Sequence, residues 1–384
     1  MSCSSTNQTR FFVDYFRHII LAVMWRTSVR MNYRMLIALA LCFLSTAAMS
    51  TDQRPTPASK AAPRLLTIPT QIYSTVVKAK EGNAGWVFFL ILETADEGVI
   101  TPSELTLTYL SKGKPVRTET LSATALLAVD KTNYPPARLT GTVPTQPTFW
   151  PHAFRIHASV PAALGVDALE AKLSIAARNK KPKVVQTTIP IRTYGQKTSL
   201  IFPFLGKGIV SQGGAFEVGH RNRSGLYAID AIGLTDTYAP VIQGNDAIQD
   251  YAGWGRTIIA PAAGKVVQAR NDRPDQPVDG VSDPTLFAPE YPDGGDTGNS
   301  VVIDHGNGEF SLLAHLQKGS VRVRVGDEVT QGQPIALLGN SGDTTGPHVH
   351  YQLQDGPQWE FANALPAQFG NVRQTSKGSY FEAK

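Results

Sequence analysis

Short runs of apolar residues, separated by turn residues, follow one another over most of the chain. Between about residues 65 and 195 the runs are rich in β-branched and aromatic side chains, as in WVFFLIL and ELTLTYL, and helical periodicity is scarce. Runs of this length and spacing are typical of an all-β sandwich. We therefore predict an immunoglobulin-like β-sandwich over residues 65–195, with the run ALLAV (125–129) as one of its β-rich segments.

A second β-rich region extends from about residue 196 to residue 370, with runs such as NSVVIDHG, FSLLAHL and HVHYQL. Within it, VRVRV at residues 321–325 alternates strictly, as a strand with one buried face does. We predict a second all-β domain over residues 196–370. A polar, proline-rich linker over residues 51–64 precedes the first domain, and a loose polar tail over residues 371–384 follows the second.

The first 50 residues have a different pattern. Residues 35–49 form a short apolar run that two arginines precede and small residues follow, which is typical of a secretory signal peptide. The run is too short for a comfortable transmembrane span. We predict a leader over residues 1–50, with Met31 or Met35 as candidates for the true start. Cleavage would release an exported protein of the periplasm or cell envelope, and an uncleaved membrane anchor is the alternative.

Composition narrows the classes of function. Among 384 residues, 42% are hydrophobic and 17% are charged, which is typical of a globular chain. The net charge of +5 is modest and no cluster of Lys and Arg dominates, so nucleic acid is not an expected partner. The only cysteines, Cys3 and Cys42, lie in the leader, so a metal site in the folded body must use histidine and carboxylate ligands.

Histidines are concentrated in the second domain. His348 and His350 are two residues apart in an alternating run, and a strand would place both on one face. Upstream, His220 follows a glycine and Asp230 ends the short apolar run after it. A catalytic zinc ion takes three protein ligands and keeps one open position for water. His220, Asp230 and one histidine of the pair would supply such a set, leaving His315 and the other histidine for acid–base chemistry.

Six segments of the second domain form an ordered set. They are GH…YAID (219–230), IIAPAAGKVV (258–267), GNSVVIDHGNG (298–308), AHL (314–316), GDEVTQGQPIALLGNSG (326–342) and GPHVHYQL (346–353). In order and spacing they resemble the lysostaphin-type zinc metalloendopeptidases, a family of peptidoglycan hydrolases. The resemblance covers roughly residues 200–360 and implies an antiparallel β-sheet domain of the hammerhead or barrel-sandwich type.

The resemblance also implies a role for each matching residue. His220, Asp230 and His350 match the zinc ligands of the family, while His315 and His348 match its two catalytic histidines. Nine residues separate His220 from Asp230, where the family commonly has three. A longer form that ends in Tyr-Ala-x-Asp also occurs in the family, and this chain resembles that form.

Other polar residues of the chain receive structural interpretations. Gln352 stands where the family often has Glu, and by strand alternation it shares a face with His350, whose imidazole it is expected to orient. We interpret His305 as bonded to the backbone of a turn and Asp327 as a turn residue. His152 is interpreted as a surface or packing residue of the sandwich.

The resemblance therefore implies an exported endopeptidase that uses one zinc ion to activate water and hydrolyses peptide bonds of peptidoglycan stem peptides or cross-links. Peptidoglycan is the expected partner, and a membrane is expected only through an uncleaved leader. The alternatives are a non-catalytic envelope-binding regulator of other cell-wall hydrolases and a peptidase of protein substrates. The presence of all five matching residues favours the enzyme. The bond cleaved, the identity of the general base and the oligomeric state are left open.

Overall fold

The computed structural model describes residues 62–69, 71–74, 83–94, 100–130, 149–177, 181–213, 220, 225–242, 244, 247–277, 282–286, 297–359 and 362–384. The predicted leader, both candidate starts and most of the predicted linker lie outside these residues. Among the residues described, no helix is long and apolar enough to cross a membrane. Strands predominate, so the prediction of an all-β fold is confirmed.

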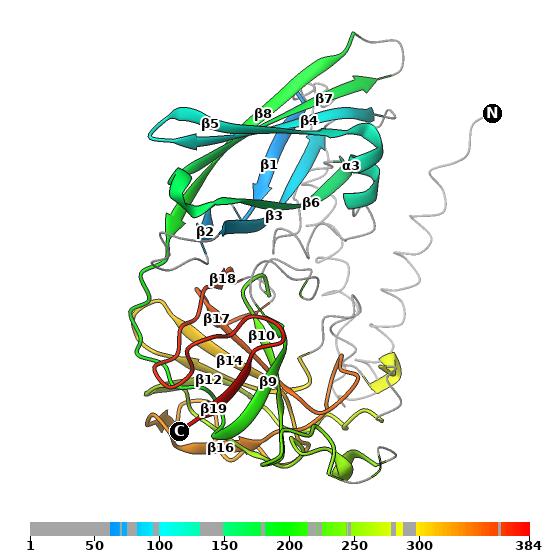
Figure 1. Ribbon diagram of the computed structural model, residues 1–384. Coiled ribbons are helices and arrows are strands. Elements are labelled where there is room, and N and C mark those ends of the chain that lie inside the picture. Colours follow the sequence, from blue (N-terminus) through cyan, green and yellow to red (C-terminus); the bar gives the residue numbers. More distant parts are fainter. Residues whose placement is uncertain are drawn as a thin grey trace, which may run out of the picture. The chain divides into compact units, whose positions relative to one another are not determined.

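Two facing sheets form the N-terminal part of the described chain (Figure 1). The first sheet has the order β1 (Arg64–Ile68), β3 (Asn83–Thr94) and β6 (Phe149–Pro161). The second has the order β2 (Ile72–Ser74), β8 (Lys183–Thr193), β7 (Ala168–Ala177), β4 (Ile100–Ser111) and β5 (Lys114–Ser122). Buried side chains from both sheets, among them Phe88, Leu107 and Ile189, form one core between them. The immunoglobulin-like assignment of this sandwich stays a prediction.

The long apolar run of β3 is buried on both of its faces. Trp86, Phe88 and Leu90 point into the sandwich core, whereas Phe89 belongs to a second cluster on the other face. That second cluster includes Tyr227, which lies just upstream of strand β10 (Ile229–Gly233). A strand that is covered on both faces needs no polar alternation, which explains why WVFFLIL contains no polar residue.

A short helix replaces one of the predicted β-rich segments. The run ALLAV lies in α3 (Ala123–Val129), where the Ser122 hydroxyl accepts a hydrogen bond from the backbone N–H of Ala125. Alanine and leucine favour helix, and a serine at this position satisfies a free N–H group of the first turn. Leu126 is the buried residue of the helix. The expectation of a β segment here is wrong, because the cap and the composition were stronger signals than apolarity.

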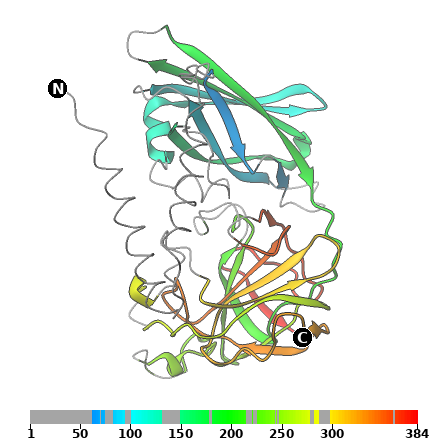
Figure 2. The same ribbon diagram turned by 180° about the vertical axis from the view of Figure 1, so that it is seen from behind.

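One antiparallel sheet organises the second part of the described chain (Figure 1). Its order is β15 (Glu328–Val329), β12 (Gly264–Arg270), β13 (Asn299–Asp304), β14 (Phe310–Leu316), β17 (Val349–Gln354), β10 (Ile229–Gly233), β9 (Gly206–Gly213) and β19 (Tyr380–Ala383), with β18 (Ala364–Leu365) pairing with β17. Strands β11 (Thr257–Ile259) and β16 (Pro334–Leu337) form a separate pair. Short 3₁₀ helices occur in both parts of the described chain: η1 (Ala162–Leu164) in the sandwich, and η2 (Ile248–Asp250) and η3 (Pro284–Leu286) in the second part. Figure 2 shows the same sheet from behind.

Two expectations for this part of the chain are wrong. VRVRV (321–325) forms no named strand: Val323 is buried, but Val325 is 65% exposed just before the turn at Gly326. The segment 371–384 is not a loose tail, because β19 pairs with β9 at the edge of the sheet. Phe381 packs on Phe202, with the ring centroids 4.5 Å apart. Phe381 and Ala383, two apolar residues at alternate positions, form a strand because β9 is there to pair with them. The strictly alternating segment 321–325 has no such partner strand among the described residues and forms none.

The central strands of this sheet separate two apolar faces. Leu313 on β14 and Tyr351 on β17 point into the main core of the domain. Leu312 and Ala314 point to the opposite face, where they cluster with Trp359. Ala314 is directly opposite His350 in the pairing of β14 with β17. The imidazole of His350 therefore lies on the smaller face, away from the main core.

Candidate metal centre

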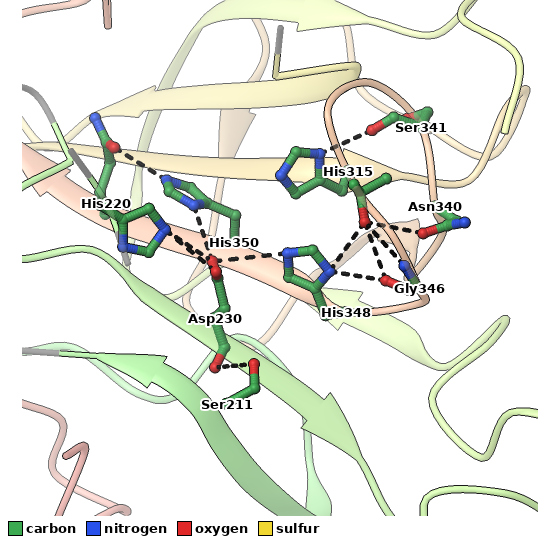
Figure 3. A network of polar contacts seen from close by, with 11 residues as sticks. Ser211, His220, Asp230, His315, Asn340, Ser341, Gly346, His348 and His350 are labelled. Atoms are coloured by element: carbon green, nitrogen blue, oxygen red, sulfur yellow. Dashed lines mark hydrogen bonds and ion pairs between the residues drawn. The ribbon is translucent and has the colours of Figure 1, made fainter. Parts of the chain in front are cut away.

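Three neighbouring strands carry Asp230, His315 and His350, while His348 directly precedes β17 and His220 lies upstream of β10. Asp230 on β10 is paired directly with His350 on β17, and His350 is paired in turn with Ala314 on β14. Directly opposite residues of an antiparallel pair share a face and have Cβ atoms about 5 Å apart. Figure 3 shows His220, His348 and His350 turned toward the carboxylate of Asp230. The sheet register therefore brings these residues together from positions far apart in the sequence.

His220, Asp230 and His350 form a group able to hold a metal ion, with one potential ligand atom from each within 4.8 Å of the others. His220 Nε2 lies 3.2 Å from the Asp230 carboxylate, and His350 Nδ1 lies 3.0 Å from Asp230 Oδ1. The carboxylate is buried and the two histidines are partly buried. Two imidazoles and one carboxylate, with no thiol, are a donor set that fits a catalytic zinc ion.

The carbonyl oxygen of His220 accepts a hydrogen bond from a strand of the sandwich. Arg155 on β6 donates from Nη2 to the carbonyl oxygen of His220 over 3.2 Å. Tyr227 is buried, and its hydroxyl donates to the carbonyl oxygen of Tyr73 and accepts from the Tyr73 N–H. His220 Nε2 lies 3.2 Å from the Asp230 carboxylate, so the nine residues between them in the sequence do not keep the two side chains apart.

His315 reaches the site through an unusual backbone conformation. Its φ of 59° lies in the left-handed region, which a non-glycine residue rarely adopts. The side chains on either side show the consequence: Leu313 and Leu316 both point into the main core, although strict alternation would separate them. The ring of His315 lies 4.8 Å from that of His348 and 5.8 Å from that of His350, between centroids. Strain of this kind is concentrated at functional sites.

The two histidines outside the ligand group are both anchored through Nδ1. His315 Nδ1 lies 2.8 Å from the Ser341 carbonyl oxygen, and His348 Nδ1 lies 2.8 Å from the Gly346 carbonyl oxygen. Carbonyl oxygens only accept, so each Nδ1 carries a hydrogen and each neutral ring keeps its lone pair on Nε2. His348 Nε2 lies 3.7 Å from Asp230 Oδ1. Both rings therefore have the tautomer of a general base whose free nitrogen is Nε2.

A loop after β16 supplies these anchors and is itself tightly fixed. The Ser341 hydroxyl donates to the Leu316 carbonyl oxygen over 2.6 Å and accepts from the Asn299 N–H over 2.9 Å. A Cβ atom at Gly339 would lie 2.2 Å from the Gln317 nitrogen, so only glycine permits this approach. Thr344 donates to Asn340 and lies 3.2 Å from His348 Nδ1. Sequence reasoning missed these residues, although GNSG at the end of a matched segment was a signal.

Burial and the charges of neighbouring histidines act in opposite directions on the pKa of Asp230 but in the same direction on the pKa of His315. Burial alone would raise the pKa of the Asp230 carboxyl, but the charges of His220 and His348, with hydrogen bonds from neighbouring histidines, hold that pKa well below its ordinary value. Burial and the charges of His348 and His350 lower the pKa of His315 well below its usual range. The carboxylate is therefore ionised and the His315 ring neutral at neutral pH.

Comparison with known proteins identifies the domain that contains this site. Residues 244–360 match Peptidase family M23. The chain contains an M23 peptidase domain. The predicted lysostaphin-type family is thereby confirmed. The match includes His315, His348 and His350, whereas His220 and Asp230 lie before its first residue. Asp230 joins these histidines through the pairing of β10 with β17, and His220 joins them through its contact with Asp230.

Short segments of this chain are similar to curated proteins. Peptidoglycan DD-endopeptidase ShyA of Vibrio cholerae is 50% identical over 56 residues, which is 15% of this chain and 13% of that protein. Murein hydrolase activator EnvC of Escherichia coli is 43% identical over 54 residues, 14% of this chain and 12% of that protein. This chain therefore spans about an eighth of the length of these relatives. Among solved structures, the catalytic domain of lysostaphin from Staphylococcus simulans has 19% identity and a TM-score of 0.24, covering 42% of this chain and 88% of that one.

Two polar residues of the M23 domain have the structural roles predicted for them. His305 Nδ1 bonds to the Ala263 carbonyl oxygen and Nε2 to the Ser311 hydroxyl, both at 2.8 Å. The Asp327 carboxylate accepts from the Arg324 N–H within a turn. In the sandwich, His152 packs between the Asp130 carboxylate and the Ile100 carbonyl oxygen. None of these three contacts the metal-ligand group.

The left-handed backbone at His315 predicts an unusual order of stability between two variants. A Cβ atom in this conformation costs about 1–2 kcal/mol, and glycine avoids that cost. We expect His315→Gly to unfold with a free energy about 1 kcal/mol higher than His315→Ala, although glycine normally weakens a strand. Urea unfolding of the two metal-free proteins measures the difference. A more stable alanine variant would contradict the strained backbone.

Proposed function

We propose that this protein is an exported, zinc-dependent endopeptidase that hydrolyses peptide bonds in peptidoglycan stem peptides or cross-links. The observation that carries the proposal is the ligand group of His220, Asp230 and His350 with His315 and His348 beside it. A 56-residue segment of this chain is similar to relatives named peptidoglycan DD-endopeptidases. The peptide part of peptidoglycan is therefore the proposed substrate, and the leader over residues 1–50 is proposed to direct the chain to the envelope.

The ligand group would hold zinc through His220 Nε2, His350 Nδ1 and the Asp230 carboxylate. Bound zinc supplies a Lewis acid for the scissile carbonyl and lowers the pKa of a water molecule. The buried carboxylate, ionised at neutral pH, offsets part of the positive charge at the centre. Burial of the site also strengthens every electrostatic interaction within it.

His315 and His348 would handle protons and oxyanion charge beside this centre. Each presents an Nε2 lone pair, because its Nδ1 hydrogen is held by a backbone carbonyl oxygen. A neutral imidazole can take a proton from attacking water, and the resulting imidazolium can pass it to the leaving amine or stabilise the oxyanion. The low pKa of His315 keeps its ring neutral at neutral pH, so that its Nε2 lone pair stays free.

A non-catalytic regulator is the rival function, and one relative is named a murein hydrolase activator. A non-catalytic regulator would not require a buried carboxylate in contact with two imidazoles. It would also not require His315 and His348 to be held in one tautomer. The group is complete in this chain, which favours the enzyme.

Removal and return of the metal test the proposed function. Purified protein is stripped with a chelator, reloaded with one equivalent of zinc and incubated with purified sacculi. We expect soluble peptides to be released by the zinc-loaded protein and not by the stripped protein. A zinc-loaded protein that releases nothing from any sacculi would overturn the enzyme and favour the regulator.

A further inference from the structure

A line of side-chain amides leads away from the ligand group along β17. Gln352 and Gln354 follow His350 at intervals of two residues, so all three side chains share one face of the strand. His350 Nε2 lies 3.0 Å from Gln352 Oε1, and Gln352 Nε2 donates to Gln354 Oε1. Gln354 Nε2 donates over 2.6 Å to the carbonyl oxygen of Gly356. The line therefore begins at a metal ligand and ends at a fixed backbone atom.

The hydrogen bonds of this line can run in one direction only. The Gly356 carbonyl oxygen accepts and cannot donate, so it must face the NH₂ group of Gln354. Gln354 Oε1 then faces Gln352 and accepts from its NH₂ group, which leaves Gln352 Oε1 facing His350. An oxygen at that place requires a hydrogen on His350 Nε2. In a metal-binding, neutral ring the lone pair is then on Nδ1, the nitrogen 3.0 Å from Asp230.

Packing alone does not explain the two amides. Gln352 is 2% exposed and Gln354 is fully buried. Across the strand pair, they lie opposite Leu312 and Phe310, so apolar residues would fit the same face. A buried amide destabilises the fold unless it is hydrogen bonded. Two buried amides on the same face of β17, hydrogen bonded to each other, therefore indicate that this face has a role beyond packing.

We propose that Gln352 and Gln354, anchored on Gly356, form a positioning relay that sets the ring orientation and the tautomer of His350 and thereby raises the affinity of the ligand group for zinc. The inference rests on the proposed function only in that the group binds a metal. Gln354 is a positioning residue that contacts neither the metal ligands directly nor the substrate. Outer partners of ligating histidines typically change metal affinity by about 10–100-fold.

Zinc affinity, measured by competition with a chromophoric chelator, tests the relay independently of hydrolysis. We expect Gln352→Met to weaken zinc binding by about 10–100-fold and Gln354→Met, one link further away, by about 10-fold. Gln352→Glu keeps an acceptor oxygen for His350 Nε2 but cannot donate to Gln354 Oε1, so we expect it to lose less zinc affinity than Gln352→Met loses. If Gln354→Met fails to fold, Gln354→Glu tests the anchor on Gly356 instead, because its carboxylate still accepts from Gln352 but cannot donate to the Gly356 carbonyl oxygen. We expect weaker zinc binding in this variant, and unchanged affinity would overturn the relay.

The matched control is Gln196→Met. Gln196 makes amide hydrogen bonds to Thr198 and Gln368, away from the ligand group. Its loss should lower the free energy of unfolding without changing zinc affinity. Imidazole ¹⁵N spectra of the zinc-loaded wild type should place the His350 hydrogen on Nε2, and Gln354→Met should alter that signal.

Three results separate the possible failures. Unchanged zinc affinity in both methionine variants would overturn the relay and leave the proposed enzyme intact. A wild-type protein that binds no zinc would overturn the relay and the metal centre together. Tight zinc binding that the variants weaken, in a protein that cleaves no sacculi, would support the relay while the proposed hydrolysis fails.

Discussion

Replacement of His350 by alanine is expected to weaken zinc binding by about 100-fold, so that the purified protein retains little zinc, and to abolish peptide release. His350 is one of three proposed ligands, with His220 and Asp230. Its Nδ1 lies 3.0 Å from the Asp230 carboxylate. If a binding free energy of about 10 kcal/mol is shared among the ligands, each contributes about 3 kcal/mol. Such a loss weakens binding by about 100-fold. An open coordination site made of His220 and Asp230 alone would also lose its geometry.

Metal analysis of the purified protein and chelator competition measure this effect. The matched control is His305→Gln, since His305 lies in the same domain but bonds to Ala263 and Ser311 rather than to the ligand group. We expect the control to keep one zinc ion per chain. Wild-type turnover by a zinc-free His350→Ala protein would contradict the proposed mechanism.

Replacement of His348 by alanine is expected to separate metal binding from catalysis. His348 Nδ1 is held by Gly346, and its Nε2 lies 3.7 Å from Asp230, too far for a hydrogen bond. Its removal leaves all three proposed ligands in place, so zinc should be retained. General acid–base groups contribute about 10²–10⁴-fold, and we expect kcat to fall by that range with a small change in KM.

Steady-state rates on cross-linked muropeptides, paired with zinc analysis of the same samples, measure this separation. Added imidazole should restore part of the rate of His348→Ala, because the vacated space can admit a free ring. A His348→Ala protein that loses zinc together with activity would reassign His348 from proton transfer to metal binding.

The period of a β-strand accounts for much of what the sequence alone predicted about the site. It placed His348 and His350 on one face, and it placed Gln352 beside His350, where the contact is present at 3.0 Å. It could not place His315, because a φ of 59° breaks the alternation there. His315 was instead proposed because it is a further histidine of the second domain, and the family resemblance then gave it a catalytic role.

Contacts between distant segments explain what sequence reasoning missed. Ser341 and Gln354 act through partners whose approach depends on the fold, such as the close passage of Gly339 over Gln317. Strand β19 could not be predicted for the same reason: its two apolar residues form a strand because the edge of β9 is available for pairing. The local pattern of apolar residues is enough to predict an all-β fold. Edge strands, backbone bends and anchoring loops depend on contacts between distant segments, which the sequence alone does not show.

Digestion of one defined cross-linked muropeptide by the zinc-loaded protein, with product masses measured, tests the central claim most directly. We predict two products whose summed mass exceeds that of the substrate by one water molecule, with the break at a peptide bond. The stripped protein and His350→Ala should leave the substrate intact. Unchanged substrate after incubation with the zinc-loaded wild type, or cleavage at a glycosidic bond, would contradict the account.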